Sequence, residues 1–198
     1  MIITISRQCG SGGHTIGKML ADRLGYDFYD KDIIKAVSVE SGLSEKTVER
    51  EGEYSTTSLL YNIAVNGISP YNVSSKDHML IRDLVNSYQV DFIKKAAEKG
   101  NCIIIGRSAD YILRDRSDCL NIFVHGDLDD RAKRVVDEHE VGEAEARQHV
   151  LDRDKKRSKY YRHVTDQVWG MAENYDLCLN TSKLGIDRCV DIICDAIE

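Results

Sequence analysis

A glycine-rich segment near the start of the sequence, RQCGSGGHT at residues 7–15, has the composition of a phosphate-binding loop. It follows the apolar run MIITIS and precedes a helix-forming segment, and such loops occur between a strand and a helix. Gly10, Gly12 and Gly13 would let backbone N–H groups approach phosphate oxygens and take positive φ angles. The N-terminus of the following helix would add partial positive charge. The segment therefore predicts a site for the phosphates of a nucleotide.

The loop lacks the lysine that most phosphate-binding loops present, because Gly13 and His14 stand where a lysine and a hydroxyl residue are usual. Arg7, at the end of the preceding strand, is the nearest cation, and its planar guanidinium can bind two phosphate oxygens. We therefore expect Arg7 to replace the lysine. Thr15 or Ser11 could supply the hydroxyl that usually meets Mg²⁺, directly or through water.

A literal match to the lysine motif begins at Gly12 and ends at Lys18, with methionine rather than Ser or Thr after the lysine. In that register the strand would not run directly into the loop, and the helix would have about two turns before Gly25. A helix that begins near Gly13 has about three turns and a continuous apolar face. We therefore predict that this helix starts near Gly13 and that Lys18 faces solvent.

A second candidate region is RDKKRSKYYR, residues 153–162, in a chain whose formal net charge is −6. Its basic residues are Arg153, Lys155, Lys156, Arg157, Lys159 and Arg162, and its single acid is Asp154. Such a stretch is either the solvated face of a helix or a local anion site. The rest of the chain must decide between these two interpretations.

The elements that position these segments alternate between apolar runs and amphipathic or charged segments. We expect strands at 1–6, 102–106, 120–126 and 175–182, and helices at 13–24, 31–37, 78–99, 127–139, 142–161 and 186–197. The continuous apolar character of the strands indicates a sheet covered on both faces. Alternation of strands with helices predicts an α/β fold with a parallel sheet. Residues 51–78 are polar and weakly periodic, and we expect them to form an insertion outside the sheet.

Length and composition limit the class of protein. A chain of 198 residues suits one domain, or one domain with a small mobile lid. No apolar run approaches the roughly 20 residues that span a bilayer, and the acidic net charge argues against nucleic-acid or membrane-surface binding. We therefore expect a cytoplasmic protein. Its six cysteines have no CxxC pair and are expected to be reduced.

With the loop in this register, the sequence resembles the cytidylate kinase-like family of P-loop nucleoside monophosphate kinases. ISRQCGSGGHTIGKMLADRLGYDFYDKDII is similar to the family's first strand, glycine loop and helix, and GNCIIIGRSADYIL to its Gly-Arg segment. LNIFVHGDLDDRAKRV resembles the connection before the lid, DRDKKRSKYYRHVTDQVW the lid, and YDLCLNTSKLGI the final strand. The resemblance implies a P-loop NTPase-type parallel sheet with helices on both faces, in one domain over 1–198. It also implies a helical acceptor-side insertion at about 40–90 and a basic lid at about 140–168.

The resemblance also implies roles for residues around the acceptor. Arg107 would bind the acceptor's α-phosphate, and it lies just past the end of a strand, where open α/β sheets bind ligands. Asp30 would lie near the acceptor pocket, although an Asp at that position is equally often a helix N-cap. Asp110 would either contact the acceptor or cap its helix. Arg131 would either face the nucleotide or pair with nearby acids.

The basic stretch would form a lid that closes over the phosphates. Arg153, Lys155 and Arg157 would then be the cations that stabilise the transition state of phosphoryl transfer. Tyr160 and Tyr161 would pack the lid or stack on a base. The histidines have no metal-ligand spacing, so no zinc site is expected.

By this resemblance the chain is an ATP-dependent kinase of a nucleoside monophosphate, with CMP or dCMP as the expected acceptor and ATP and Mg²⁺ as cofactors. Its expected partners are small-molecule nucleotides, and the oligomeric state stays open. Two alternatives also stay open: a nucleotide-binding regulator, and a kinase of another small metabolite. The missing lysine favours the regulator, whereas the basic lid favours a kinase. A metabolite kinase stays possible because residues 45–80 match the family least.

Overall fold

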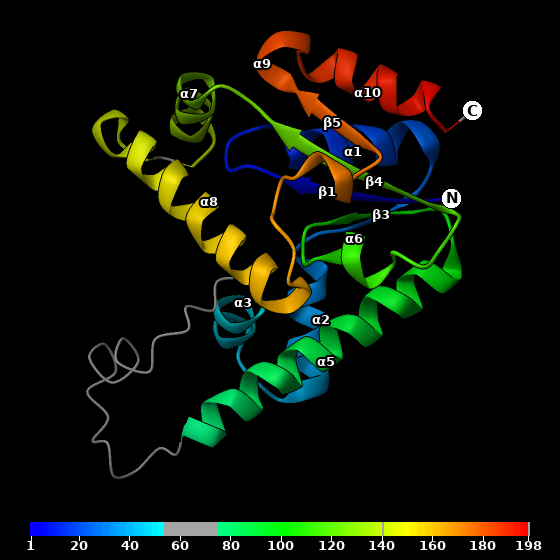
Figure 1. The fold of residues 1–198 in the computed structure, drawn as a ribbon, viewed down its shortest axis with the longest axis vertical. Helices are drawn as coiled ribbons and strands as arrows, with labels where there is room; N and C mark the ends of the chain where they lie inside the picture. Colours follow the sequence, from blue (N-terminus) through cyan, green and yellow to red (C-terminus); the bar gives the residue numbers. More distant parts are fainter. Residues whose placement is uncertain (54–74, 140, 198) are drawn as a thin grey trace.

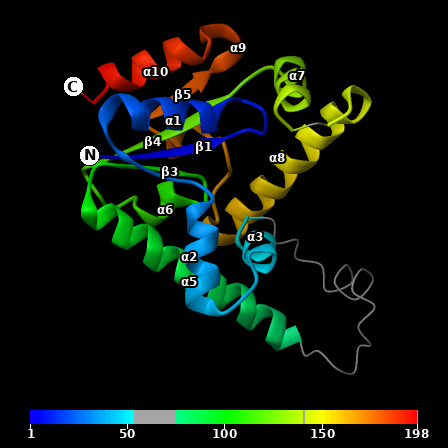
Figure 2. The same cartoon turned by 180° about the vertical axis from the view of Figure 1, so that it is seen from behind.

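The fold is a five-stranded parallel sheet with helices on both faces (Figure 1, Figure 2). It is seen in a computed structural model that describes residues 1–53, 75–139 and 141–197. The strands are β1 (Ile2–Arg7), β2 (Asp27–Tyr29), β3 (Cys102–Ile105), β4 (Cys119–His125) and β5 (Leu177–Asn180). Their order in the sheet is β2-β3-β1-β4-β5, and every neighbouring pair is parallel.

The helices connect these strands in the alternating order that the sequence predicts. They are α1 (Gly13–Leu24), α2 (Asp32–Ser41), α3 (Glu45–Glu53), α5 (Ser75–Lys99), α6 (Ala109–Ile112), α7 (Leu128–His139), α8 (Glu143–Thr165), α9 (Thr181–Leu184) and α10 (Ile186–Asp195). A 3₁₀ turn at Ala172–Asn174 precedes β5. None of the helices in the described residues combines the length and the apolar character that a membrane span requires.

The central strands are mainly apolar because helices cover both faces of the sheet. Ile3 and Ile5 of β1 are fully buried in a cluster with residues of α1 and α10. Ile2 of the same strand and Ile104 of β3 are fully buried on the other face, with residues of α2 and α5. The predicted α/β fold with a parallel sheet is therefore confirmed.

The carboxyl ends of the central strands meet at one edge of the sheet. β1 pairs with β3 from Ile2 to Ile5 and with β4 from Ile2 to Arg7, so the segments after these three strands lie together. α8 packs against α7, reaches this edge and contacts α3 (Figure 1). The glycine loop, the segment after β3 and the basic helix are thus brought to one place.

The register of the first helix is confirmed. α1 begins at Gly13, and Gly25 ends it with a left-handed φ of 67°. Lys18 is exposed on this helix, as expected for a residue outside the phosphate loop. The short strand β2 was missed, because Asp27–Tyr29 has only three residues and looks like a connection in the sequence. Of the expected insertion, residues 54–74 lie outside the described part of the chain.

Candidate active site

The glycine loop joins β1 to α1 and packs tightly against its neighbours. Gly10 and Gly12 have φ angles of 70° and 82°, which favour glycine. A Cβ at Gly10 would lie 2.3 Å from the carbonyl oxygen of Arg131, and a Cβ at Gly12 would lie 2.3 Å from Cδ1 of Ile186. A larger residue at Gly10 would displace the backbone of α7, and one at Gly12 would displace the side chain of Ile186 on α10. The loop is therefore fixed from both sides, with the N-terminus of α1 behind it.

Gly13 differs from the expectation, because it is the first residue of α1 and has no positive φ. It has a different reason to be glycine: a Cβ there would lie 2.7 Å from Cβ and 2.9 Å from Cγ of Arg7. The aliphatic stem of Arg7 thus fills the space in which a side chain at position 13 would begin. An ordinary loop has glycine at the end of the strand and lysine at the start of the helix. Here the strand position holds Arg7 and the helix position holds Gly13.

The guanidinium of Arg7 lies across the end of the sheet. A Cβ at Gly106 would lie 2.0 Å from its Nη1, so only glycine leaves room for the guanidinium there. Its Nη2 lies 3.8 Å from Oδ1 of Asp30, and the Arg7 side chain is 13% exposed. Asp30 follows β2 and does not cap α2, whose N-cap is Lys31. The structure therefore brings Arg7 and Asp30 together beside the loop.

The two residues considered for the missing hydroxyl, Ser11 and Thr15, and His14, which stands in its place, differ in their surroundings. Ser11 is fully buried, and its hydroxyl lies 2.9 Å from the carbonyl oxygen of Gln8 and 3.1 Å from that of Val124. It braces the loop from inside. His14 is exposed, and its Nδ1 lies 2.8 Å from Oδ2 of Asp30. Thr15, in the first turn of α1, is exposed.

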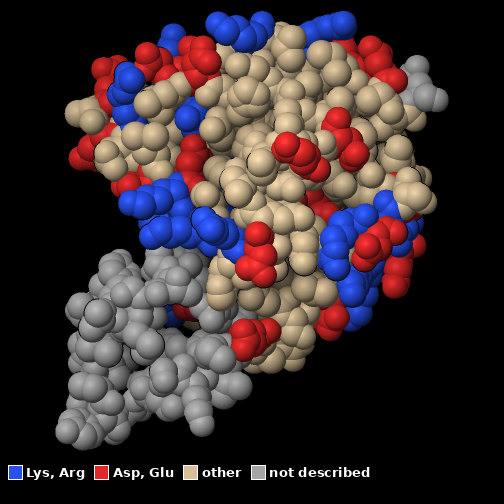
Figure 3. Space-filling view, viewed as in Figure 1, with Lys and Arg blue, Asp and Glu red and all other residues tan. Residues whose placement is uncertain are grey.

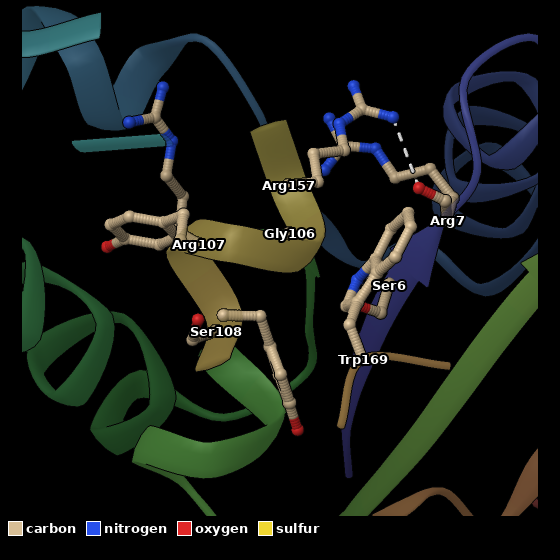
Figure 4. A pocket seen from close by; sticks show the side chains of 9 residues that line it. Ser6, Arg7, Gly106, Arg107, Ser108, Arg157 and Trp169 are labelled. Atoms are coloured by element: carbon tan, nitrogen blue, oxygen red, sulfur yellow. Dashed lines mark hydrogen bonds between the residues drawn. The ribbon is translucent and has the colours of Figure 1, made fainter. Parts of the chain in front are cut away.

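The basic helix α8 contacts the loop directly. Nη1 of Arg157 donates to the carbonyl oxygen of Arg7 at 3.1 Å (Figure 4). Asp154, the single acid of the basic stretch, accepts from the backbone N–H of Cys9 at 2.7 Å. Many of the other basic side chains of α8 gather at the surface (Figure 3). α8 is thus joined to the loop through one cation and one carboxylate.

The structure separates the three predicted lid cations. Arg153 and Arg157 are one helical turn apart and half-buried on the side of α8 that faces the loop. Burial raises the pKa of the Cys9 thiol, and the charges of Arg157 and Arg153 oppose this rise. Lys155 is exposed and lies two positions from each arginine, so it is on the other side of the helix. Lys155 is therefore not brought to the site.

Arg131 has the surroundings of a structural residue. It is 5% exposed, and its Nη1 donates to Oδ2 of Asp154 at 2.6 Å and to the carbonyl oxygen of Cys9 at 3.2 Å. Its Nε donates to the carbonyl oxygen of Gly126 at 2.9 Å. These contacts join α7, the loop and α8, and they favour pairing with a nearby acid over contact with the nucleotide.

Arg107 follows β3 at the same edge of the sheet and is 6% exposed. Its Nη1 donates to Oε1 of Gln89 on α5 at 2.9 Å. A Cβ at Gly52 of α3 would lie 2.6 Å from the same nitrogen, so α3 packs closely over the guanidinium. The backbone of Arg107 is left-handed, with a φ of 58°. Gln89 and α3 therefore fix the position of the Arg107 guanidinium.

Asp110, on α6, links that helix to the lid. Its carboxylate accepts from the hydroxyl of Tyr161 at 2.6 Å. Burial raises the pKa of Asp110 from 3.8 to about 6, although the Tyr161 hydroxyl and the backbone N–H groups of Asp110 and Tyr111 oppose this rise. The N-cap position of α6 belongs to Ser108, and Asp110 lies inside the first turn. The link to Tyr161 is a feature that the sequence did not indicate. Tyr161 packs the lid, as one of its two interpretations expected.

These residues surround a small pocket between the loop and the lid (Figure 4). Its lining residues are Ser6, Arg7, Gly106, Arg107, Ser108, Arg157, Tyr160, Tyr161 and Trp169. Three arginines therefore line one space at the carboxyl end of a parallel sheet, where open α/β sheets bind ligands. The guanidinium groups of Arg7 and Arg157 lie on one side of it, and that of Arg107 points the other way, toward Gln89 (Figure 4). Sequence reasoning missed Trp169 and Gln89, and no pattern in the sequence distinguishes either of them.

Comparisons with known proteins agree with this geometry. A model of the family described as the cytidylate kinase-like family matches residues 2–183. The cytidylate kinase of Pyrococcus horikoshii is 25% identical over 199 residues, which cover 100% of this chain and 88% of that protein. The cytidylate kinase of Halobacterium salinarum is 23% identical over 198 residues, which cover 100% and 90%.

Solved structures give the same fold. An uncharacterized protein from Eubacterium ventriosum has a TM-score of 0.73 and 27% identity, over 100% of this chain and 97% of that one. A shikimate kinase from Bacteroides thetaiotaomicron has a TM-score of 0.55 and 12% identity, over 100% and 98%. At this identity the second likeness concerns the fold alone.

Proposed function

The chain belongs to the cytidylate kinase-like family, and from this premise we propose that it transfers the γ-phosphoryl group of ATP to a nucleoside monophosphate. CMP or dCMP is the proposed acceptor. The observation that carries the proposal is that Arg7, Arg107 and Arg157 all line one pocket between a glycine loop and a basic helix. Phosphoryl transfer asks a protein mainly to hold two anions in line and to neutralise the charge that develops between them.

Arg7 supplies the loop cation in this proposal. Its stem occupies the space in which a lysine at position 13 would begin, so the guanidinium reaches out from the same part of the loop. The backbone N–H groups of the loop and of the first turn of α1 bind the β- and γ-phosphates of ATP. A guanidinium can bind two oxygens of the γ-phosphate at once, whereas an ammonium acts as a point charge.

Arg107 binds the acceptor's phosphate, and Arg157 stabilises the transition state. Arg107 is fixed at the end of β3 by Gln89 and by α3, so it holds the acceptor in place before the lid closes. Arg157 comes from α8, the proposed lid, and its Nη1 donates to the carbonyl oxygen of Arg7 in the loop. Arg153, one turn away on the same side of α8, adds positive charge near the loop. Lys155 has no part in the proposal.

The loop fits Mg²⁺ through fewer protein ligands than usual. Ser11 is turned inward and His14 replaces the usual hydroxyl, while the two carboxylate oxygens of Asp30 face His14 and Arg7. The exposed Thr15 lies in the first turn after the loop. Hard oxygen ligands suit Mg²⁺, and the ion commonly keeps several waters and phosphate oxygens. We propose that the Thr15 hydroxyl holds it together with the phosphates of ATP. When bound, the ion neutralises phosphate charge.

One observation favours a second candidate, a nucleotide-binding regulator. His14 stands in place of the hydroxyl that a phosphoryl-transfer loop normally offers to Mg²⁺, and it pairs with Asp30. A binding protein has no need of that hydroxyl. The closed lid favours the kinase, because a cation brought from a lid to the loop serves transfer more than binding.

A screen of acceptors with ATP and Mg²⁺ tests the proposal. The screen follows ADP formation with each nucleoside monophosphate and with a panel of small hydroxylated metabolites. We expect activity with CMP or dCMP, and we expect Arg157→Ala to remove most of it, which would show that the activity belongs to this protein. Activity confined to a metabolite would replace the acceptor. No transfer to any acceptor, with ATP binding retained, would leave the regulator.

A further inference from the structure

His14 and Asp30 form a side-chain pair beside the glycine loop. His14 is the second residue of α1, and its Nδ1 lies 2.8 Å from Oδ2 of Asp30, the residue after β2. The imidazole ring also packs edge to face against Phe28 of β2, with 5.4 Å between the ring centres and 76° between the ring planes. Two contacts with the same segment of the chain therefore fix the orientation of the ring.

The contact with Asp30 determines which ring nitrogen is available for chemistry. An ionised carboxylate only accepts hydrogen bonds, so the proton of the neutral imidazole lies on Nδ1 and the lone pair lies on Nε2. Nε2 has no hydrogen-bond partner among the described residues. The side chain of His14 is 59% exposed, whereas that of Asp30 is 18% exposed. The pair thus presents a nitrogen lone pair at the surface and keeps its carboxylate behind it.

The other oxygen of Asp30 connects this pair to the proposed phosphate site. Oδ1 of Asp30 lies 3.8 Å from Nη2 of Arg7, the cation that we propose for the γ-phosphate. One carboxylate therefore lies between the imidazole and the guanidinium. His14 also follows Gly13 directly, in the turn whose backbone N–H groups bind phosphates in the proposed function. A γ-phosphate bound there would lie beside Nε2 of His14.

The imidazole brings a chemistry to this position that a hydroxyl does not. In an ordinary loop the Ser or Thr at this position binds Mg²⁺ through its oxygen. Mg²⁺ prefers oxygen ligands, so a histidine here removes a metal ligand. It adds a nitrogen nucleophile, and histidine is one of the side chains that form covalent intermediates in enzymes. A carboxylate on Nδ1 assists such a reaction, because it stabilises the positive charge that develops on the ring.

We propose that His14 is a phosphorylation site, which accepts the γ-phosphoryl group of ATP bound to the same chain. The Nε2 lone pair attacks the γ-phosphorus, and a P–N bond forms while the bond from this phosphorus to the β,γ-bridging oxygen breaks. The electron pair of the broken bond leaves with ADP. The proton stays on Nδ1, where Asp30 accepts its hydrogen bond and balances the charge of the ring. The inference rests on the proposed ATP site and is independent of the acceptor.

Phosphorylation of His14 would restrain the enzyme. A phosphoryl group on Nε2 would occupy the space beside Arg7 and add negative charge where the γ-phosphate of the next ATP must bind. Like charges at such short distances repel each other, so the modified protein should bind ATP severalfold more weakly. Transfer to the acceptor would then slow when ATP is abundant and the acceptor is scarce.

Labelling of the full chain tests the site. The protein is incubated with Mg²⁺ and ATP that carries a radioactive γ-phosphate, without an acceptor. A phosphoryl group on histidine is lost in acid and kept in alkali, which distinguishes it from an ester of Ser, Thr or Tyr. We expect such a label, mapped to His14 by mass spectrometry, and we expect His14→Gln to remove it. His163→Gln, at an exposed histidine of α8, is the matched control and should keep the label.

Asp30→Asn separates a positioning role from a structural one. The amide has the shape of the carboxylate but not its charge, so labelling at saturating ATP should slow about tenfold or more. The affinity for a non-hydrolysable ATP analogue, measured by calorimetry, should be unchanged or higher, because a negative charge beside the phosphates has been removed. Weaker binding with an unchanged labelling rate would assign Asp30 to structure and overturn its part of the proposal.

The restraint is tested separately, by the rate of transfer to CMP before and after incubation with ATP alone. Each protein is compared with its own starting rate. The rate of the unmodified protein should fall as the label accumulates, and that of His14→Gln should stay constant. A label on His14 without this fall would support the site and overturn the restraint.

The remaining outcomes distinguish this inference from the proposed function. No label, or a label that His14→Gln retains, would overturn the phosphorylation site. A label on His14 in a protein that transfers no phosphoryl group to any acceptor would support the site and contradict the proposed function alone. Transfer to CMP by a protein that acquires no label would support the proposed function and overturn the inference.

Discussion

The exchange of Arg7 and Gly13 gives a prediction with a defined size. Arg7→Ala removes the loop cation, and the loss of a charge-assisted contact with phosphate should weaken ATP binding by about 1.5–3 kcal/mol. That corresponds to a dissociation constant about ten to a hundred times larger. Gly13→Lys alone should also weaken binding, because the new Cβ would lie 2.7 Å from Cβ of Arg7 and the loop must shift.

The double change Arg7→Gly with Gly13→Lys should restore much of the affinity. Removing the arginine stem frees the space in which the lysine begins, and Gly13 has a helical backbone that lysine adopts without strain. The assay is calorimetry with a non-hydrolysable ATP analogue, with Lys18→Ala as the control on the same helix. If the double variant binds no better than Arg7→Ala, the two positions are not equivalent and the reasoning fails. A larger loss in Lys18→Ala would place the phosphate at the literal motif instead.

Three further predictions concern the rest of the site. Arg157→Ala should lower kcat far more than it raises either KM, because its contact belongs to the closed lid. Lys155→Ala, on the far side of α8, should leave kcat and both KM values near normal. Equal losses of kcat in the two variants, measured by steady-state kinetics, would contradict this. Arg107→Ala should raise the KM for the acceptor and leave ATP affinity in calorimetry nearly unchanged, and an equal loss for both ligands would place Arg107 between the phosphates. Asp110 has its pKa raised from 3.8 to about 6 in the folded protein, so the native state binds more protons between these values and stability should fall as pH rises from about 4 to 6, by on the order of 3 kcal/mol. Asp110→Asn should remove that dependence in urea unfolding at pH 4.5 and 7.5, and an unchanged pH profile would assign the dependence to other groups.

Much of the fold follows from the sequence because hydrophobic burial on two faces leaves a strong pattern. CIIIG and LNIFVHG are continuous apolar runs, and a strand covered by helices on both sides requires that character. The start of α1 could also be predicted, since a complete apolar face fits only a helix that begins near Gly13. Strand β2 could not, because Asp27–Tyr29 carries three half-buried or exposed residues and no periodicity extends over so short a length.

The site was predictable where it depends on the chain's local order and less so where it depends on contacts between distant segments. Arg7 is the last residue of β1 and Arg107 comes shortly after β3, and parallel strands bring such residues to one edge. The orientation of α8 about its axis determines that Arg157, and not Lys155, faces the loop. That orientation depends on packing, which the charge pattern of the sequence does not show. The partner of Asp110 is 51 positions away, and the partner of Arg107 on α5 is 18 positions away, so neither contact has a local signal.

The contact between the stem of Arg7 and Gly13 also limits how this loop can change over generations. A mutation to lysine at position 13 first meets the arginine, and a mutation of the arginine to glycine first leaves the loop without its cation. With the proposed role of Arg7, each single step between the two kinds of loop would therefore weaken ATP binding. Passing from the arginine form to the lysine form would then require both residues to change together.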